Sequence, residues 1–119
     1  MIYRRGENGM QEIVINEGYS RAGILEKARQ CVCGEREQDY GTPEDNFTTI
    51  GKMWEVYLKA ANPERDVPEI NAKDVAIMMA LLKTAHIATG SSMDSFVDLA
   101  GYAACAGEIA IKAQNGERE

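Results

Sequence analysis

Apolar side chains recur every three or four residues along most of the chain beyond residue 19, a spacing typical of amphipathic α-helices. Residues that favour helix starts and helix ends divide this pattern into four segments. The predicted helices run from Ser20 to Gly34, from Thr42 to Asn62, from Asn71 to Gly90 and from Met93 to about Gln114. The sequence therefore predicts an all-α fold, a compact antiparallel bundle of about four main helices.

The starts of two of these helices are marked by specific residue types. Thr42 is followed by Pro43 and then by acids, which combines a capping hydroxyl with a proline that loses no helical hydrogen bond. Asn71 with Asp74 repeats the capping arrangement. Between these two helices, residues 63–70 include two prolines and several charges, so we expect a loop there.

The chain before the first helix has a different character. Residues 1–18 mix glycine with polar and charged residues around one short β-prone run, Glu12 to Asn16. A strand of this length is marginal alone. We therefore expect residues 1–18 to form an arm or docking strand, residues 19–114 a single helical domain, and residues 115–119 a charged tail.

The helix from Asn71 to Gly90 is apolar on most of its circumference, which predicts a central position in the bundle. The last helix is rich in small residues, and we expect Gly101 and Gly107 where another helix approaches closely. That neighbour could belong to a second copy of the chain, so we expect a homo-oligomer, a dimer or a tetramer. The residues expected in the core are Phe47, Trp54, Leu58, Met78, Leu82, Phe96 and Ala103.

Composition and charge exclude several classes of protein. Thirteen basic against nineteen acidic residues give a net charge of -6, the wrong sign for holding duplex nucleic acid by its phosphates. The longest apolar run, Val75 to Leu82, is much shorter than the roughly 20 residues that span a bilayer. Three cysteines without a paired metal-binding spacing fit free thiols in a reducing compartment. We therefore expect a cytoplasmic protein that binds neither membranes nor duplex nucleic acid.

The run QDYGTPEDNF concentrates polar residues that a simple connector does not need. Helix capping accounts for Glu44 and Asp45, because acids are favoured in the first turn of a helix. Capping does not account for Asn46, an indifferent helix former placed directly before an apolar Phe. A second interpretation makes the run a binding site, in which the ligand is contacted by Asp39, Tyr40 and Asn46. In that interpretation Glu44 and Asp45 are metal ligands.

Asp94 and Asp98 lie four residues apart, which puts both carboxylates on one face of the last helix. Asp98 stands among apolar residues, where an unpaired carboxylate would be costly, so we expect it to have a partner. One candidate is a divalent cation such as Mg²⁺, since hard cations prefer carboxylate oxygen. The other is Lys83, which interrupts the apolar run of the neighbouring helix and also suits contact with a phosphate.

The common catalytic motifs are absent from the sequence. It contains no glycine-rich phosphate loop, no nucleophile elbow and no HExxH pair. His86 shares a helical face with Lys83, but a lone histidine is more often a surface or core residue than a catalytic base. No residue is therefore assigned a catalytic role, and the sequence alone does not establish an enzyme.

Several of these segments together resemble a family found mainly in phages and prophages, whose members have no assigned function. The resemblance rests on ILEKARQCVCGEREQDYGTPEDNF, a tryptophan-containing helix, DVAIMMALLKTAHIATG and DSFVDLAGYAACAGE. These pieces cover roughly residues 24 to 108. The resemblance implies a phage-type protein in the cytoplasm of a bacterial host and does not supply an activity.

A more distant similarity is to domains associated with nucleotide modification, which also have a DYG-like turn, a lysine in a central helix and a DLxxY element. Here these features correspond to residues 39–41, Lys83 and residues 98–102. The layout also resembles the all-helical nucleoside triphosphate pyrophosphohydrolases of the MazG and dimeric dUTPase type, which hold Mg²⁺ with acids from two antiparallel helices. This chain lacks their paired ExxE and ExxD motifs. The acids that could take their place are Glu44, Asp45, Asp94 and Asp98.

The sequence leaves two hypotheses open. In the first, the protein binds nucleotides or is a Mg²⁺-dependent pyrophosphohydrolase, with Lys83 on phosphate and Tyr40 or Asn46 on the base or sugar. In the second, it is a non-catalytic helical oligomer that binds another protein, and the same polar residues serve as caps and ion pairs. A DNA-binding domain fits least, because the chain is acidic and has no basic helix.

Overall fold

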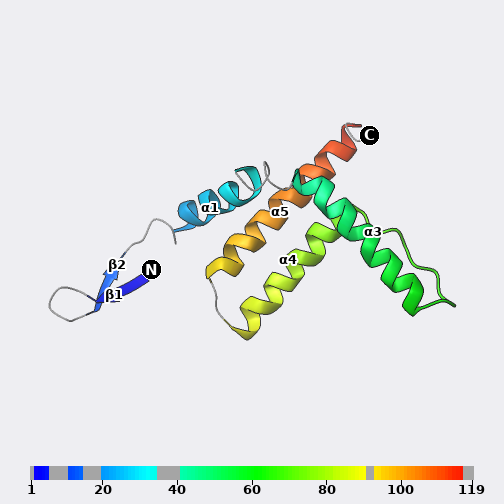
Figure 1. Ribbon diagram of the computed structural model, residues 1–119. Coiled ribbons are helices and arrows are strands. Elements are labelled where there is room, and N and C mark those ends of the chain that lie inside the picture. The colour runs from blue at the N-terminus through cyan, green and yellow to red at the C-terminus, as the bar shows by residue number, and fades with distance from the viewer. Residues whose placement is uncertain (1, 6–10, 15–19, 35–40, 91–92, 117–119) are drawn as a thin grey trace.

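The computed structural model describes residues 2–5, 11–14, 20–34, 41–90 and 93–116. These residues form four helices and a pair of short N-terminal strands (Figure 1). The elements are β1 (Ile2–Arg5), β2 (Gln11–Val14), α1 (Arg21–Cys33), α3 (Pro43–Ala61), α4 (Ala72–Thr89) and α5 (Met93–Gln114). The prediction of an all-α fold with four main helices is therefore confirmed.

Side-chain caps start three of the helices at the predicted residues. The hydroxyl of Ser20 accepts a hydrogen bond from an amide in the first turn of α1, at 3.0 Å. Thr42 Oγ1 accepts one from the amide of Asp45 in α3, at 3.2 Å. At α4, Asn71 and Asp74 each accept a hydrogen bond from the other's backbone amide, at 2.9 and 3.1 Å. These bonds satisfy first-turn amides that have no helical acceptor, which is why polar residues mark the helix starts.

α4 and α5 lie side by side and run antiparallel, whereas α1 runs in the same direction as α5 (Figure 1). α1 packs against α5, and α3 packs against the N-terminal part of α4 before diverging from it. The prediction of a bundle of packed helices is confirmed, and α4 and α5 are its antiparallel pair. Among the described helices, none combines the length and the apolar character that crossing a bilayer requires.

The most buried side chains lie where α3 crosses the start of α4. Val75 and Ala76 have no exposed surface. Gly51 of α3 approaches the carbonyl of Ile70 so closely that a side chain at this position would overlap it. The buried cluster consists of Phe47, Ile70, Ala72, Val75, Ala76, Cys105 and Ala106. The core therefore joins α3, α4 and α5 to the loop between α3 and α4.

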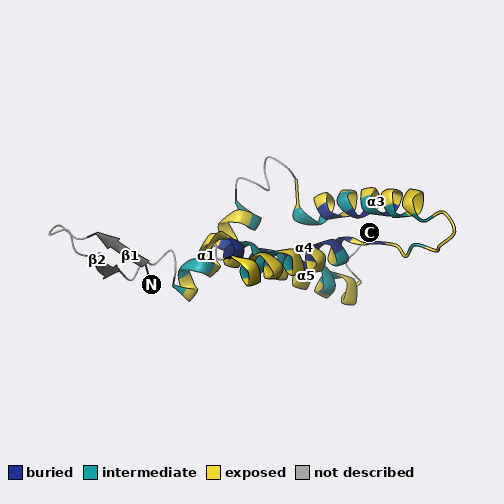
Figure 2. Cartoon of the chain, turned by 90° about the horizontal axis from the view of Figure 1, so that it is seen from below, coloured by how far each residue is buried: buried dark blue, intermediate teal, exposed yellow. Residues whose placement is uncertain are grey.

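The predicted core is correct in α3 and wrong farther along α4 and α5. Phe47 is buried, and Trp54 and Leu58 pack against the same cluster with part of their surface exposed. The predicted core residues that are exposed instead are Met78, Leu82, Phe96 and Ala103. The described helices leave part of the surface of α4 and of α5 exposed (Figure 2), and these four side chains lie on those exposed parts.

The two glycines expected where another helix approaches α5, Gly101 and Gly107, have different surroundings. At Gly101, an added Cβ would lie 3.2 Å from Cγ1 of Val32, so α1 does approach α5 closely there. At Gly107, an added Cβ would meet no described atom within 4 Å. The prediction is therefore confirmed for Gly101. At Gly107 no described helix of the same chain comes close, and the approach of a second copy there stays a prediction.

The N-terminal β-prone run pairs within its own chain. β1 and β2 form a two-stranded antiparallel sheet in which Ile2 lies opposite Val14 and Arg5 opposite Gln11. The strand expected in this arm is therefore present, and its partner is the preceding strand. Residues 15 and 16 of the predicted run lie outside the described residues.

Candidate functional site

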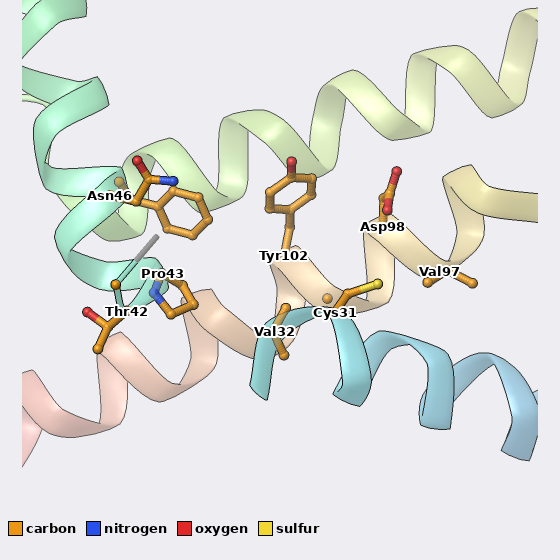
Figure 3. Close-up of a pocket in the computed structure, with 11 residues that line it drawn as sticks. Cys31, Val32, Thr42, Pro43, Asn46, Val97, Asp98 and Tyr102 are labelled. Atoms are coloured by element: carbon orange, nitrogen blue, oxygen red, sulfur yellow. The ribbon is translucent and has the colours of Figure 1, made fainter. Parts of the chain in front are cut away.

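A pocket opens between three segments that are distant in the sequence: the end of α1, the turn that leads into α3, and the first half of α5 (Figure 3). Its volume is about 80 Å³. The residues that line it are Cys31, Val32, Gly41, Thr42, Pro43, Asn46, Phe47, Val97, Asp98, Gly101 and Tyr102. The pocket therefore includes Asn46 and Asp98, two of the residues singled out in the sequence.

The local sequence explains how the start of α3 reaches the pocket. Gly41 has a φ of 81°, a left-handed conformation that glycine adopts without steric strain. Thr42 then caps the helix and Pro43 occupies its first turn, so the chain enters α3 abruptly. Asn46 follows in the same turn, and its side-chain amide borders the pocket (Figure 3).

An aromatic pair forms one wall of the pocket. The ring of Phe47 is buried, and its centroid lies 5.9 Å from that of Tyr102 with the two planes tilted by 45°. Tilted pairs at this separation are a favourable arrangement for aromatic rings. The pair therefore joins the start of α3 to α5 directly beside the polar side chains of the site.

The carboxylate of Asp98 is held at the edge of the pocket by a lysine from another helix. Asp98 lies one turn before Tyr102 on α5, and both side chains project toward α4 (Figure 3). Nζ of Lys83 on α4 lies 3.0 Å from Oδ2 of Asp98. The lysine side chain is 20% exposed and the aspartate side chain 37% exposed. The prediction that Asp98 has a partner, with Lys83 as a candidate, is confirmed.

The four acids predicted to bind Mg²⁺ do not gather at one point of a single chain. Glu44 and Asp45 occupy the first turn of α3, where the helix dipole favours them. Asp94 is exposed in the first turn of α5, and Asp98 pairs with Lys83. Among the described residues, no group of three or more His, Cys, Asp or Glu side chains could hold a metal ion. The described residues do not form a Mg²⁺ site within one chain, and Mg²⁺ binding stays a prediction from sequence.

Three of the residues predicted to contact a ligand or a metal lie at or beside the pocket. Asn46 and Asp98 both line the pocket, and Lys83 reaches its edge through the ion pair with Asp98. Asp39 and Tyr40 fall outside the described residues.

Two residues of α1 line the pocket although no sequence motif marks them. Cys31 and Val32 lie on the apolar stripe of α1 and have the character of ordinary packing residues. Tyr102, in contrast, follows Asp98 by four residues, a spacing that places both on one helical face. That spacing is the signal from which Tyr102 could have been assigned to the site.

The three cysteines are free, as predicted. Cys31 and Cys33 are exposed, and Cys105 is buried. Burial raises the pKa of the Cys105 thiol, and the charge of Glu108 adds to the shift. Cys105 is therefore a packing residue, whereas Cys31 is accessible at the pocket.

One buried acid has a structural partner away from the pocket. Glu55 is buried in α3, and its Oε2 accepts a hydrogen bond from the backbone amide of Ile70 at 2.7 Å. This bond attaches the end of the loop between α3 and α4 to the middle of α3. Sequence analysis does not single out Glu55, because a charged residue on a helix normally faces solvent.

These features define a small helical-bundle protein with a mixed aromatic and polar pocket between its helices, a common location for ligand sites in such folds. The chain belongs to the family described as Domain of unknown function (DUF6378), whose model matches residues 23–110. That range includes every residue that lines the pocket.

Two similar proteins come from phages. The chain is 40% identical to the Gene 55 protein of Mycobacterium phage D29 over 95 residues, which cover 79% of this chain and 58% of that protein. It is 38% identical to the Gene 55 protein of Mycobacterium phage L5 over 81 residues, which cover 67% of this chain and 47% of that protein. The chain thus spans about half the length of these relatives. No solved structure matches it. The predicted resemblance to a phage-encoded family of unassigned function is confirmed.

Proposed function

We propose that this phage-type protein binds a nucleotide in the pocket between α1, α3 and α5, with the base or the sugar between Asn46 and Asp98. The observation that carries the proposal is the meeting of residues 41–47 with residues 97–102 around one pocket. Each of these segments contributes one aromatic ring and at least one polar side chain that can form hydrogen bonds. Apolar pockets with a few such polar groups are the usual form of small-molecule sites.

Each of these side chains has a group that suits a nucleoside. The carboxamide of Asn46 presents both donors and an acceptor, the pattern that reads the edge of a base. The carboxylate of Asp98 can accept hydrogen bonds from sugar hydroxyls or from a base amino group. The rings of Phe47 and Tyr102 offer an aromatic wall for apolar contact with the base.

Lys83 supports the same proposal from the edge of the pocket. Its ammonium group has three donors, and the bond to Asp98 needs one of them. The others are suited to a phosphate, whose negative charge would otherwise be opposed by the chain's net charge of -6.

The size of the pocket indicates which part of a nucleotide it would receive. Its volume of about 80 Å³ is well below the roughly 300 to 1,000 Å³ of sites for larger ligands. We therefore place a base or a sugar inside and the phosphates outside. Asp39 and Tyr40, predicted as further contacts, directly precede Gly41 of the pocket in sequence.

A thermal-shift experiment tests this proposal. The full chain is heated with each of a panel of ribo- and deoxyribonucleoside mono-, di- and triphosphates, and at least one is expected to raise the melting temperature. Asn46→Ala is expected to remove that shift. The matched control is Asn115→Ala, an exposed asparagine beyond the end of α5, which is expected to keep it. A wild-type protein that no nucleotide stabilises would refute the proposal.

The sequence resemblance to MazG-type enzymes supports a more specific form of this proposal. In it, the bound nucleotide is a nucleoside triphosphate, which the protein hydrolyses to the monophosphate and pyrophosphate. That reaction needs metal ligands beyond those that one chain offers among the described residues. Binding and hydrolysis are therefore measured separately, the second as pyrophosphate release with and without Mg²⁺. Binding without release would leave the first proposal in place and reject the second. Either version acts in the host cytoplasm, where the nucleotide pool lies.

The alternative candidate is a non-catalytic helical oligomer that binds another protein. The exposed apolar side chains of α3 and α4 favour it, since such surfaces commonly mark interaction sites. It predicts no effect of any nucleotide on the melting temperature, so the same thermal-shift panel separates the two functions.

A further inference from the structure

α4 leaves one long apolar face uncovered in a single chain. Its buried residues Ala72, Val75 and Ala76 lie on the side that contacts α3 and α5. The exposed apolar side chains on the rest of its circumference are Ile77, Met78, Leu81, Leu82 and Ala85, and the exposed Thr84 and Ala88 lie beside them. We refer to the first five of these residues, Ile77 to Ala85, as the outer face of α4.

The outer face of α4 carries no charge. Lys83 is the one charged residue between Ala76 and His86, and it turns to the opposite side of the helix to pair with Asp98. A helix that is apolar on most of its circumference, as α4 is, is normally buried on most of its sides. Large exposed apolar surfaces on soluble proteins mark places where another molecule binds.

α3 has a similar uncovered stripe. Met53, Val56 and Tyr57 are exposed on the side of α3 away from the buried Phe47 and Gly51. Their spacing of three and four residues places them on one helical face. The uncovered apolar surface is therefore not confined to one helix.

The total surface of the chain is larger than that of a compact monomer of the same mass. The chain exposes 8958 Å², whereas a compact monomer of 13.1 kDa exposes about 6,400 Å². The excess is about 2,600 Å², and a stable pairwise interface buries about 800 Å² of each partner. This total also counts residues outside the described ranges, so only part of the excess belongs to the helices, and about a third of it already equals the area that each partner of a stable dimer buries.

We propose that a second copy of this chain covers the outer face of α4, which packs against the same face of its partner. In such a two-fold contact both partners present the same residues, so one interface covers both apolar faces at once. A net charge of -6 on each copy opposes self-association in general, and the uncharged outer face is where this repulsion is weakest. A row of Ile, Met and Leu side chains on helical spacing also provides the interlocking surface that helix pairs use.

The mass of the full-length protein in solution tests the proposal. Size-exclusion chromatography with light scattering is expected to give a multiple of 13.1 kDa, at least two copies. Leu81→Glu puts a carboxylate into the proposed interface and is expected to raise the dissociation constant by at least about tenfold.

The chain offers a closely matched control for this variant. Leu25 on α1 is 64% exposed and Leu81 is 63% exposed, so Leu25→Glu makes the same change at a site equally open to solvent. Leu25→Glu is expected to keep the wild-type mass. Circular dichroism of both variants establishes that their helices are intact.

A second measurement covers the case in which Leu81→Glu does not fold. If folding and pairing are coupled, the urea midpoint of the wild-type protein rises with protein concentration. A wild-type protein that is monomeric, with a midpoint independent of concentration, overturns the proposal. So does a Leu81→Glu variant that keeps the wild-type mass, or a monomer whose α4 binds phosphatidylcholine vesicles. Nucleotide binding is measured independently, so the two proposals can fail separately.

Discussion

Lys83 of α4 and Asp98 of α5 form an ion pair at the edge of the pocket, with 3.0 Å between Nζ and Oδ2. Each residue interrupts a stretch that is otherwise apolar or small. Either charge alone would be unfavourable beside the packed helices, whereas the pair neutralises both. The contact also holds the Asp98 carboxylate one turn from Tyr102, in the position where the proposed ligand would meet it.

Breaking this pair is expected to change stability only slightly. Because both side chains are partly exposed, solvent screens their attraction, which contributes about 1 kcal/mol or less. Lys83→Met and Asp98→Asn are each expected to lower the free energy of unfolding by no more than that amount. The double variant is expected to lose less than the sum of the two, a coupling measured by urea denaturation of the four proteins. Strict additivity would show that the two charges do not interact.

Glu55 is expected to contribute more to stability than its charge suggests. Its carboxylate is the acceptor for the Ile70 amide in a buried place. Glu55→Ala removes the acceptor and leaves a buried amide without a partner, which costs about 1 to 3 kcal/mol. Glu55→Gln keeps an oxygen that can accept the same bond and is expected to lose less. Urea denaturation gives both values.

The control for Glu55 is Glu69→Gln, a change at an exposed acid beside Ile70 whose ion pair with Lys52, at 3.7 Å, is open to solvent. Its effect on the free energy of unfolding is expected to stay within about 0.5 kcal/mol. Equal losses at the two positions would show that the bond to Ile70 does not matter.

Two glycines on helices are expected to respond to alanine in opposite directions. At Gly51, a Cβ would overlap the Ile70 carbonyl oxygen and crowd Val75, so Gly51→Ala is expected to destabilise by about 1 to 3 kcal/mol. At Gly107, nothing described lies within 4 Å of the new atom. Alanine there improves helix propensity, and Gly107→Ala is expected to stabilise by about 0.5 to 1 kcal/mol. Thermal denaturation distinguishes the two, and a tolerated Gly51→Ala would contradict the close approach of α3 to the loop.

The raised pKa of Cys105 makes stability depend on pH in the alkaline range. Burial raises the pKa of this thiol above its ordinary value of 9.0, so the unfolded chain loses the proton at a lower pH than the folded chain. The resulting contribution to stability is fully present below about pH 9 and is lost as the pH rises through the raised value. Cys105→Ala is expected to show a flatter decline of unfolding free energy between about pH 8 and about pH 10. Parallel declines for the two proteins would remove Cys105 as the cause.

The polar residues at the ends of the helices could be predicted from sequence because their partners are local. Thr42 bonds to an amide three residues away, as do Asn71 and Asp74 to one another. The need of Asp98 for a partner could be predicted in the same way, since a carboxylate among apolar residues on a helix is conspicuous. The buried bond of Glu55 could not, because its partner Ile70 lies in a loop that follows the helix.

The sequence by itself determined where each described helix begins and ends, because caps and hydrophobic periodicity act within one or two turns. It could not tell Val75 from Met78, since both are apolar residues of one helix that is apolar on most sides. Only the tertiary structure decided that Val75 is buried and Met78 exposed, and that residues 41–47 meet residues 97–102 at a pocket. Burial and convergence depend on how distant segments pack against one another, and no short stretch of sequence contains that information.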